Sequence, residues 1–591
     1  MASRVTTRVG KPLDALRFDT SGPPQIMDVV ADHLRRLGAH ADPSGPWDTA
    51  SGRVVLSGDG FAPVLARALW AAPDSGLVDE ATVQAATGVM AVHGRRDGTP
   101  RGLAVDWLAT VTGVLTVQGL LATMLGQVRG GTADRVTTCA DRAGLLTVSQ
   151  YLAAADVEEE EATELSPGGP PFTSEDGVLF ELETLDPGAW AAFWRALEAP
   201  GDAIRAGWRP FQFRYATACA PFPQALHATT RAHGFDGIRR AAALAGADVC
   251  RLRTLKERAA EHDGADPWKL TPLAAGGPRD TGSPTPERPL AGITVLEAGR
   301  RIQAPLTAHL LGLLGAEVIR IEPPGGDPLR GMPPACSGIS ARWLALNRGK
   351  QAVEIDIKDP ADRLRLRDLA SRADVFLHNW APGKAAQLGL DSDDLSRANP
   401  ALVYAYTGGW ADRVDDPPMG TDFMVQARTG VGEAVRPEGE APAPSLMTLL
   451  DVLGGLQGTE AVLAGLLMRE RTGRGVRVDS SLLGAADTLT APALRRAAEG
   501  GDPRQPEGFR RPLPTADGWV APSDDSAAAA AGHDLTGLTT DDALNRLRAQ
   551  GLTAARVTTD LADLRDDPRF PGSIGRDAHG APTVPEPWSF A

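Results

Sequence analysis

The chain has 591 residues, of which 42% are hydrophobic and 23% charged, close to the averages of globular proteins. This length exceeds what one hydrophobic core usually supports, so several domains are expected. The net charge of −15 argues against a general nucleic-acid-binding protein, because phosphate contacts need a basic face. A local group of arginines and lysines can still hold a small anion in an acidic protein.

The cysteines and the apolar runs indicate the compartment. The four cysteines are far apart and form no CxxC pair, which fits a reducing compartment and predicts no metal site. The first residues lack the apolar segment of a signal peptide. No uncharged apolar run reaches the roughly 18 residues that span a membrane. We therefore expect a cytoplasmic protein with no membrane contact.

Apolar spacing predicts alternating helices and strands in the first half. In chain order we expect a helix at 25–40, a strand at 52–60, helices at 61–72 and 81–93, an apolar helix-period run at 106–130, a strand at 135–139, a helix at 140–155 and a strand at 176–184. Residues 274–288 are rich in Pro, Gly, Ser and Thr and are typical of a linker.

The second half begins with a strand–helix–strand pattern. Strands are expected at 292–299, 317–322, 353–357, 374–379 and 402–407, with a helix at 305–314. This order predicts an α/β fold with a doubly wound, Rossmann-like parallel sheet.

The two halves repeat each other. The run DWLATVTGVLTVQGLLATMLGQVRG at 106–130 and the run DVLGGLQGTEAVLAGLLMRERTGRG at 451–475 each begin with aspartate and end on glycine. Residues 31–40, 176–178 and 246–257 match 308–317, 517–519 and 551–563 in the same order. We predict a first copy at 1–273 (large-domain part about 13–156, small-domain part about 172–270), the linker at 274–288, and a second copy at 289–591 (large domain about 289–500, truncated small domain about 510–591).

Several motifs of the second copy are more specific. PLAGITVLEAG (289–299), LLGAEVIRIEPPGGDPLRG (313–331), LNRGKQAVEIDIKDP (346–360), ADVFLHNWAPGKAAQLGL (373–390) and RTGRGVRVDSSLLGAA (471–486) surround the Asp451 run. Together they resemble the class III CoA-transferases, the CaiB/BaiF family. The resemblance implies Rossmann-like large domains, smaller α/β domains and two subunits interlinked like rings. Two fused copies then form an intrachain pseudo-dimer, either monomeric or dimerised again.

Asp451 matches the family's catalytic aspartate. The resemblance implies that its carboxylate attacks an acyl-CoA thioester, passes through a mixed anhydride and an aspartyl-CoA thioester, and so moves CoA to a free carboxylic acid. The alternative is a plain helix N-cap, which aspartate also favours. Asp106 heads a copy that lacks the NRGK, HNWAPG and GGDPLRG motifs, so we interpret it as a structural relic.

CoA carries phosphates and an adenine, and cationic and N–H groups are expected around it. The resemblance implies a CoA site made of Arg300, Arg301, Gln303, Ala304, Arg330, Arg348, Lys350, Asn379, Trp380 and Thr421. CoA is expected as part of the substrate, with no tightly bound cofactor.

Two other functions stay open. A non-catalytic acyl-CoA-binding pseudoenzyme fits the eroded first copy. An α-methylacyl-CoA racemase is disfavoured, because Thr421 stands where those relatives have the histidine that moves the α-proton. Neither the acyl group nor the acceptor acid can be read from a motif.

Overall fold

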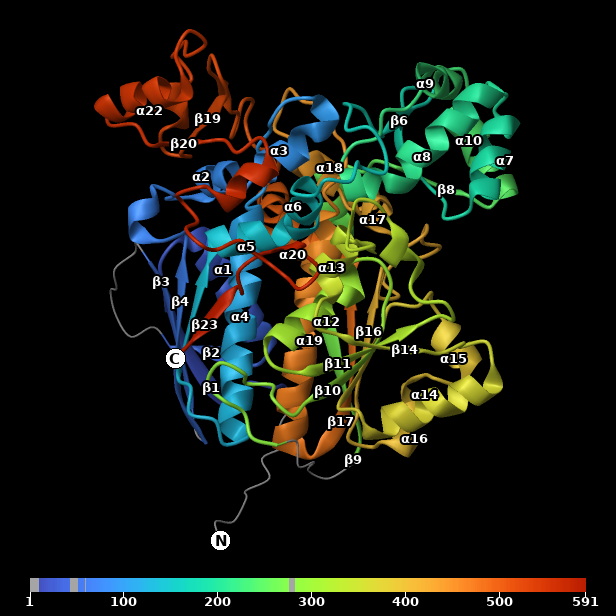
Figure 1. Ribbon diagram of the computed structural model, residues 1–591, viewed down its shortest axis with the longest axis vertical. Coiled ribbons are helices and arrows are strands. Elements are labelled where there is room, and N and C mark those ends of the chain that lie inside the picture. The colour runs from blue at the N-terminus through green and yellow to red at the C-terminus, as the bar shows by residue number, and fades with distance from the viewer. Residues whose placement is uncertain (1–9, 43–50, 59, 276–281) are drawn as a thin grey trace.

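We analysed a computed structural model that describes residues 10–42, 51–58, 60–275 and 282–591. Each half of the chain contributes one large sheet, and the two long helices α4 (Trp107–Val128) and α19 (Leu449–Thr472) lie beside each other between these sheets (Figure 1). The predicted α/β fold built from two related units is confirmed. Of the predicted linker, residues 276–281 lie outside the described part.

The sheet of the second copy has seven strands in the order β14-β11-β10-β15-β16-β17-β9. All neighbours from β14 to β17 are parallel, so the Rossmann-like sheet is confirmed. The strand order changes direction between the neighbours β10 and β15, because β11 and β14 are added on one side of β10 and β15 to β17 on the other. Ligands of such sheets bind at the strand ends of this switch point. The strands are β9 (Trp268–Ala275), β10 (Thr294–Ala298), β11 (Glu317–Glu322), β14 (Gln351–Glu354), β15 (Val375–His378), β16 (Val403–Gly408) and β17 (Arg474–Ser481).

The sheet of the first copy is mixed rather than parallel. Its six strands run in the order β2 (His40–Ala41), β1 (Leu16–Ser21), β3 (Gly52–Gly58), β4 (Phe61–Leu69), β5 (Arg135–Cys139) and β23 (Trp588–Phe590). The helix predicted at 61–72 is wrong, because this segment is strand β4. It pairs antiparallel with β3 and parallel with β5, with Val64, Ala66 and Ala68 buried on one face. Pairing on both sides prevails over the helix propensity of its alanines and leucines.

The two copies exchange strands. Strand β9 (Trp268–Ala275), at the end of the first copy, pairs antiparallel with β17 of the second. Strand β23, at the end of the chain, pairs antiparallel with β5 of the first copy. Each large sheet is therefore completed by the other copy, which interlocks the two halves.

The two central helices are core elements. The prediction that no apolar run is long enough to span a membrane is wrong, because both helices are long and apolar enough to do so. However, 100% and 94% of their most apolar windows are buried inside the protein. The Gln118 side chain of α4 donates a hydrogen bond to the Leu456 carbonyl of α19 at 2.7 Å. This burial accounts for their composition without a membrane.

The remaining helices cover these sheets. The first copy adds α1 (Pro24–Arg36), α2 (Glu80–Ala86), α3 (Val89–Gly94), α5 (Ala140–Thr147) and α6 (Ser149–Ala155). The second adds α12 (Gln303–Leu313), α13 (Ala341–Asn347), α14 (Pro360–Arg372), α15 (Lys384–Leu388), α16 (Ser392–Ala398), α17 (Asp422–Arg428), α18 (Val431–Ala434) and α20 (Leu482–Ala498).

A small domain from each copy lies against the other copy (Figure 1). In the first copy, β6 (Phe172–Thr173), β7 (Leu179–Glu183) and β8 (Asp248–Arg251) form a sheet beside α7 (Pro187–Ala196), α8 (Gly201–Thr217), α9 (Gln224–Arg231) and α10 (Phe235–Ala245), followed by α11 (Leu255–Glu261). Strands β7 and β8 contact α17 of the second copy. In the second copy, β18 (Leu513–Pro514), β19 (Trp519–Pro522) and β20 (Ala554–Arg556) lie beside α22 (Thr540–Ala549), and β19 and β20 contact α2 of the first copy.

Candidate functional site

Asp451 lies in the first turn of α19 and is partly buried. The helix begins at Leu449, after Thr448 in the left-handed conformation with φ of 54°. The Asp451 backbone N–H donates a hydrogen bond of 2.7 Å to the Asp422 carboxylate, so Asp422 caps this helix end. Among the described residues, no side-chain hydrogen bond or ion pair holds the Asp451 carboxylate. Asp451 is therefore not the N-cap of α19, and the alternative of a plain N-cap is wrong.

The Asp451 carboxylate stands among other acidic groups. Burial, together with the Asp422 and Glu183 carboxylates, raises the pKa of Asp451 to about 8, although the Arg301 guanidinium opposes this rise. Burial also raises the pKa of Asp422 to about 6, although Gln426 and two backbone N–H groups donate to it. The two carboxylates repel each other and ionise as a coupled pair.

The first copy forms one wall of this site. Tyr215, on α8, has its ring 5.4 Å from the Arg301 guanidinium, and the Asp451 charge adds to the burial that raises the pKa of Tyr215. Residues of the first copy also hold the loop that leads into α19. Tyr151 donates to the Leu446 carbonyl at 3.4 Å, and a His93 ring nitrogen lies 2.9 Å from the Ser445 hydroxyl. Both copies are therefore needed to shape the surroundings of Asp451.

Two loops at the switch point hold predicted CoA-binding residues. The Arg300 N–H donates to the Asn379 side chain, which in turn donates to the Arg300 carbonyl, both at 2.9 Å. The side chains of Arg300 and Arg301 are exposed, so they are available to an anionic ligand. Trp380 is buried against Phe376 and His378.

The start of α12 places two further predicted residues next to α19. Gln303 and Ala304 are both buried. A Cβ added at Gly454 of α19 would come within 2.8 Å of the Gln303 amide nitrogen. Within the described chain this nitrogen has no hydrogen-bond partner. The structure thus brings Gln303 close to the turn that follows Asp451.

The other predicted cations make their contacts inside the protein. Lys350, with a side chain only 3% exposed, donates to Glu297, to the Pro305 carbonyl and to Asn347. Arg330 pairs with Glu322 and lies 3.8 Å over the Trp343 ring, and Arg348 donates to the Leu344 and Pro582 carbonyls. Their binding to CoA stays a prediction.

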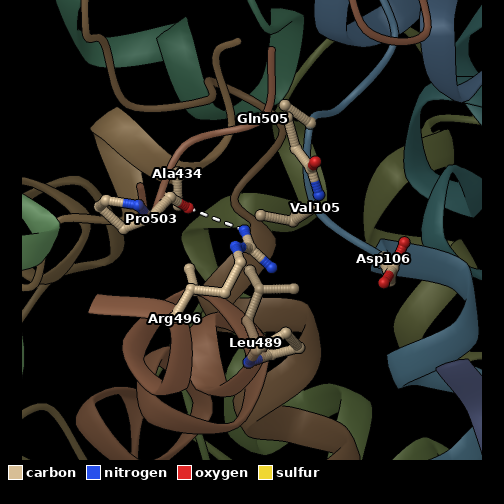
Figure 2. A pocket seen from close by; sticks show the side chains of 10 residues that line it. Val105, Asp106, Ala434, Leu489, Arg496, Pro503 and Gln505 are labelled. Carbon is tan, nitrogen blue, oxygen red and sulfur yellow. Dashed lines mark hydrogen bonds between the residues drawn. The ribbon is translucent and has the colours of Figure 1, made fainter. Parts of the chain in front are cut away.

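The first copy's aspartate is occupied by an ion pair. Asp106, at the start of α4, accepts a hydrogen bond of 2.7 Å from Arg510, whose side chain is 2% exposed and also pairs with Asp524 at 2.7 Å. Arg510 further donates to the Val105 carbonyl at 2.9 Å. Asp106 lines a small recess beside Val105, Leu489 and Arg496 (Figure 2).

The same hydrogen-bonding frame nevertheless holds the start of the long helix in both copies. In the first copy, Glu80 accepts the N–H groups at the start of α4, and Gln84 donates to Glu80 at 2.8 Å. In the second copy, Asp422 accepts the N–H of Asp451, and Gln426 donates to Asp422 at 2.5 Å. Each glutamine also accepts a backbone N–H from the segment before the long helix, at 2.8 Å in both copies. The Ala109 N–H of the first copy thus makes the bond that the Asp451 N–H makes in the second, so Ala109, and not Asp106, is the structural counterpart of Asp451. The predicted pairing of Asp106 with Asp451 is three residues out of register, and the first copy has no carboxylate at the position of Asp451.

Comparison with known proteins agrees with this duplication. A family model described as CoA-transferase family III matches residues 75–266 and 290–564. The chain belongs to CoA-transferase family III. One matched region falls in each copy, so the predicted tandem arrangement of two family III units is confirmed.

Individual family III relatives match over shorter lengths. Succinyl-CoA:glutarate CoA-transferase of Mus musculus is 35% identical over 221 residues, which are 36% of this chain and 50% of that protein. The succinyl-CoA–L-malate CoA-transferase beta subunit of Chloroflexus aurantiacus is 37% identical over 203 residues, 33% of this chain and 49% of that protein. The chain thus spans about half the length of the curated relatives it matches.

Among solved structures, a CAIB/BAIF family protein from Brucella suis is similar to 50% of this chain. The match covers 91% of that protein, with 26% identity and a TM-score of 0.46.

Sequence reasoning missed three residues near Asp451 in this family III chain. They are Asp422, Tyr215 and Glu183, and the last two come from the first copy. Asp422 had a readable signal, because EATVQ at 80–84 and DFMVQ at 422–426 share an acidic residue four positions before glutamine. Tyr215 and Glu183 had none, since only the folding of the first copy onto the second brings them to the site.

Proposed function

We propose that this chain is a CoA-transferase that moves CoA from an acyl-CoA to a free carboxylic acid through covalent intermediates on Asp451. The observation that carries the proposal is the place of the Asp451 carboxylate at the start of α19. The first copy has Ala109 at the equivalent position, whereas the second copy has a carboxylate that no side-chain hydrogen bond or ion pair holds within the described residues. Asp451 must be ionised to act as a nucleophile, and its place in the first turn of α19 favours the ionised form, because the helix dipole is positive at this end.

The proposed reaction consists of paired acyl transfers. The Asp451 carboxylate attacks the thioester carbonyl, the carbon–sulfur bond breaks, and CoA leaves as the thiolate from a mixed anhydride. The thiolate attacks the aspartyl carbonyl and releases the donor acid as its carboxylate, which leaves an aspartyl-CoA thioester. The acceptor carboxylate then repeats these two steps in reverse order. It first displaces the thiolate and forms a second anhydride, and the thiolate then takes the new acyl group and frees Asp451.

The groups around Asp451 support this chemistry. Arg301 is the cation that favours the ionised carboxylate, and Asp422 fixes the backbone that carries it. The exposed Arg300 and Arg301 at the switch point are suited to the phosphates of CoA. CoA enters as part of the substrate. Three relatives are named for succinyl-CoA with glutarate or malate, or for acetyl-CoA with oxalate, so short dicarboxylic acids are the first acceptors to test.

Trapping of the intermediate tests the proposal. The protein is incubated with succinyl-CoA and then with hydroxylamine, which converts an acylated aspartate to a hydroxamate, and peptides are mapped by mass spectrometry. We expect the label on Asp451 in the wild type and in Asp106→Asn, and none in Asp451→Asn. Exchange activity without label on Asp451, or undiminished exchange in Asp451→Asn, would overturn the proposal. Tight CoA binding without exchange for any acid would overturn it in favour of the pseudoenzyme.

A further inference from the structure

We propose that Glu183, contributed by the first copy, is a positioning residue for Asp451 of the second copy. The inference rests on the proposed function, because it assigns a role around the Asp451 nucleophile. It also gives the first copy a task in the reaction, although that copy has Ala109 at the position of the nucleophile.

Glu183 reaches across the boundary between the copies. It ends β7 of the first small domain, and its side chain is 4% exposed. One carboxylate oxygen accepts hydrogen bonds from the Thr421 hydroxyl at 2.8 Å and from Arg214 at 3.0 Å. The other oxygen accepts the Thr184 N–H at 3.1 Å. A carboxylate with three fixed donors has little freedom to move.

Arg214 is itself locked between the two copies. Its guanidinium lies 3.9 Å from the Phe211 ring of the first copy and 4.8 Å from the Phe423 ring of the second. It also donates to the Phe211 carbonyl at 2.7 Å. Stacking on aromatic faces suits the planar arginine head group and would not be reproduced by lysine. Arg214 therefore fixes the place of Glu183.

The effect of Glu183 passes to Asp451 through two adjacent residues. Thr421, which donates to Glu183, is followed directly by Asp422 at the start of α17. Asp422 accepts the Asp451 N–H at 2.7 Å, and Gln426 on the same helix binds both Asp422 and the Ser445 backbone. A shift of the Thr421 turn would thus displace the backbone that carries Asp451.

The first site offers an internal comparison. Asp524 is the second-copy counterpart of Glu183 in the two matching small-domain strands, and it accepts from Arg510 instead of from Arg214. Arg510 corresponds to Gly169, since Leu513–Pro514 and Phe172–Thr173 are the matching strands that follow. At the Asp451 site this position carries no side chain, and a Cβ added at Gly169 would come within 2.9 Å of Leu446. The two copies therefore place their arginine differently, because Arg510 lies against the start of α4 and the corresponding position at the start of α19 has no side chain.

Two variants of Glu183 separate its charge from its hydrogen bond. The groups that face Asp451 are Asp422, Arg301, Tyr215 and Glu183. Glu183→Gln keeps an acceptor for Thr421 but loses one negative charge, so the lower midpoint of the pH profile of exchange should fall by about half a pH unit. Glu183→Ala also loses the acceptor, and kcat should fall about tenfold or more with little change in KM for the acyl-CoA.

Further variants keep the test decisive. Thr421→Val removes the same hydrogen bond from the other copy and should lower kcat like Glu183→Ala, whereas Thr421→Ser should restore it. Asp524→Asn is the matched control and should leave the pH midpoint unchanged. Wild-type kcat and pH midpoint in folded Glu183→Ala and Thr421→Val would overturn the inference. Hydroxamate on Asp451 of the wild type distinguishes this outcome from failure of the proposed function, in which the wild type is not labelled.

Discussion

Replacement of Asp451 by asparagine should stabilise the protein at alkaline pH while it abolishes CoA exchange. Burial together with Asp422 and Glu183 raises the pKa of Asp451 to about 8, so the folded state holds a proton that the unfolded chain releases near pH 4. Folding stability then falls by about 1.4 kcal/mol for each pH unit between these two values. From about pH 5 to about pH 8 the wild type should lose about 2–4 kcal/mol on this account. Asparagine does not titrate and should not show this loss.

Urea denaturation at several pH values measures the effect, and Asp106→Asn is the control. Asp106→Asn removes one of the two carboxylates bonded to Arg510. It should cost about 1–3 kcal/mol at both ends of the range. The same ionisation should also appear in the kinetics, because kcat/KM of the wild type should rise with pH up to about 8 as Asp451 loses its proton. An equal pH dependence of stability in the wild type and in Asp451→Asn would refute the reasoning, because the buried aspartate would then not be the group that titrates.

Three further substitutions separate structural from ligand-binding roles. Arg510→Met should cost about 2–4 kcal/mol in urea denaturation, because it leaves two carboxylates without their buried partner, while exchange per folded molecule changes less than about twofold. Asn379→Ala removes both bonds between the switch-point loops, and KM for the acyl-CoA should rise about tenfold at a nearly unchanged denaturation midpoint. Lys350→Met should cost about 3 kcal/mol, because Glu297 loses a buried partner; a higher KM at unchanged stability would instead place Lys350 at the CoA.

Where local pattern and tertiary environment agree, the fold could be predicted from the sequence. The strands at 292–299 and 317–322 and the helix between them were predictable because continuous apolar runs match a sheet buried on both faces. The segment at 61–72 was not, since its alanines and leucines suit a helix and only its pairing with β3 and β5 makes it a strand. Nothing local in β9 or β23 indicates that each completes the other copy's sheet.

The residues of the candidate site likewise fall into two groups, those that a local motif reveals and those that only tertiary contacts reveal. Asp451 could be found because a long motif surrounds it in one stretch of sequence. Lys350 lies in an equally specific motif, yet its amine is bonded within the protein, because a sequence motif does not tell a ligand contact from a structural one. Glu183 and Tyr215 act at a distance in sequence from Asp451, and only the contact between the copies reveals them.

Fusion of two copies in one chain explains how the two sites could diverge. In a symmetric homodimer each substitution appears at both sites, so an arginine that closes one site closes the other as well. Here the position of Arg510 in the second copy is Gly169 in the first, and the two positions lie at different sites because the small domains cross over. Arg510 can therefore stabilise the Asp106 end of the molecule while Gly169 leaves Asp451 accessible.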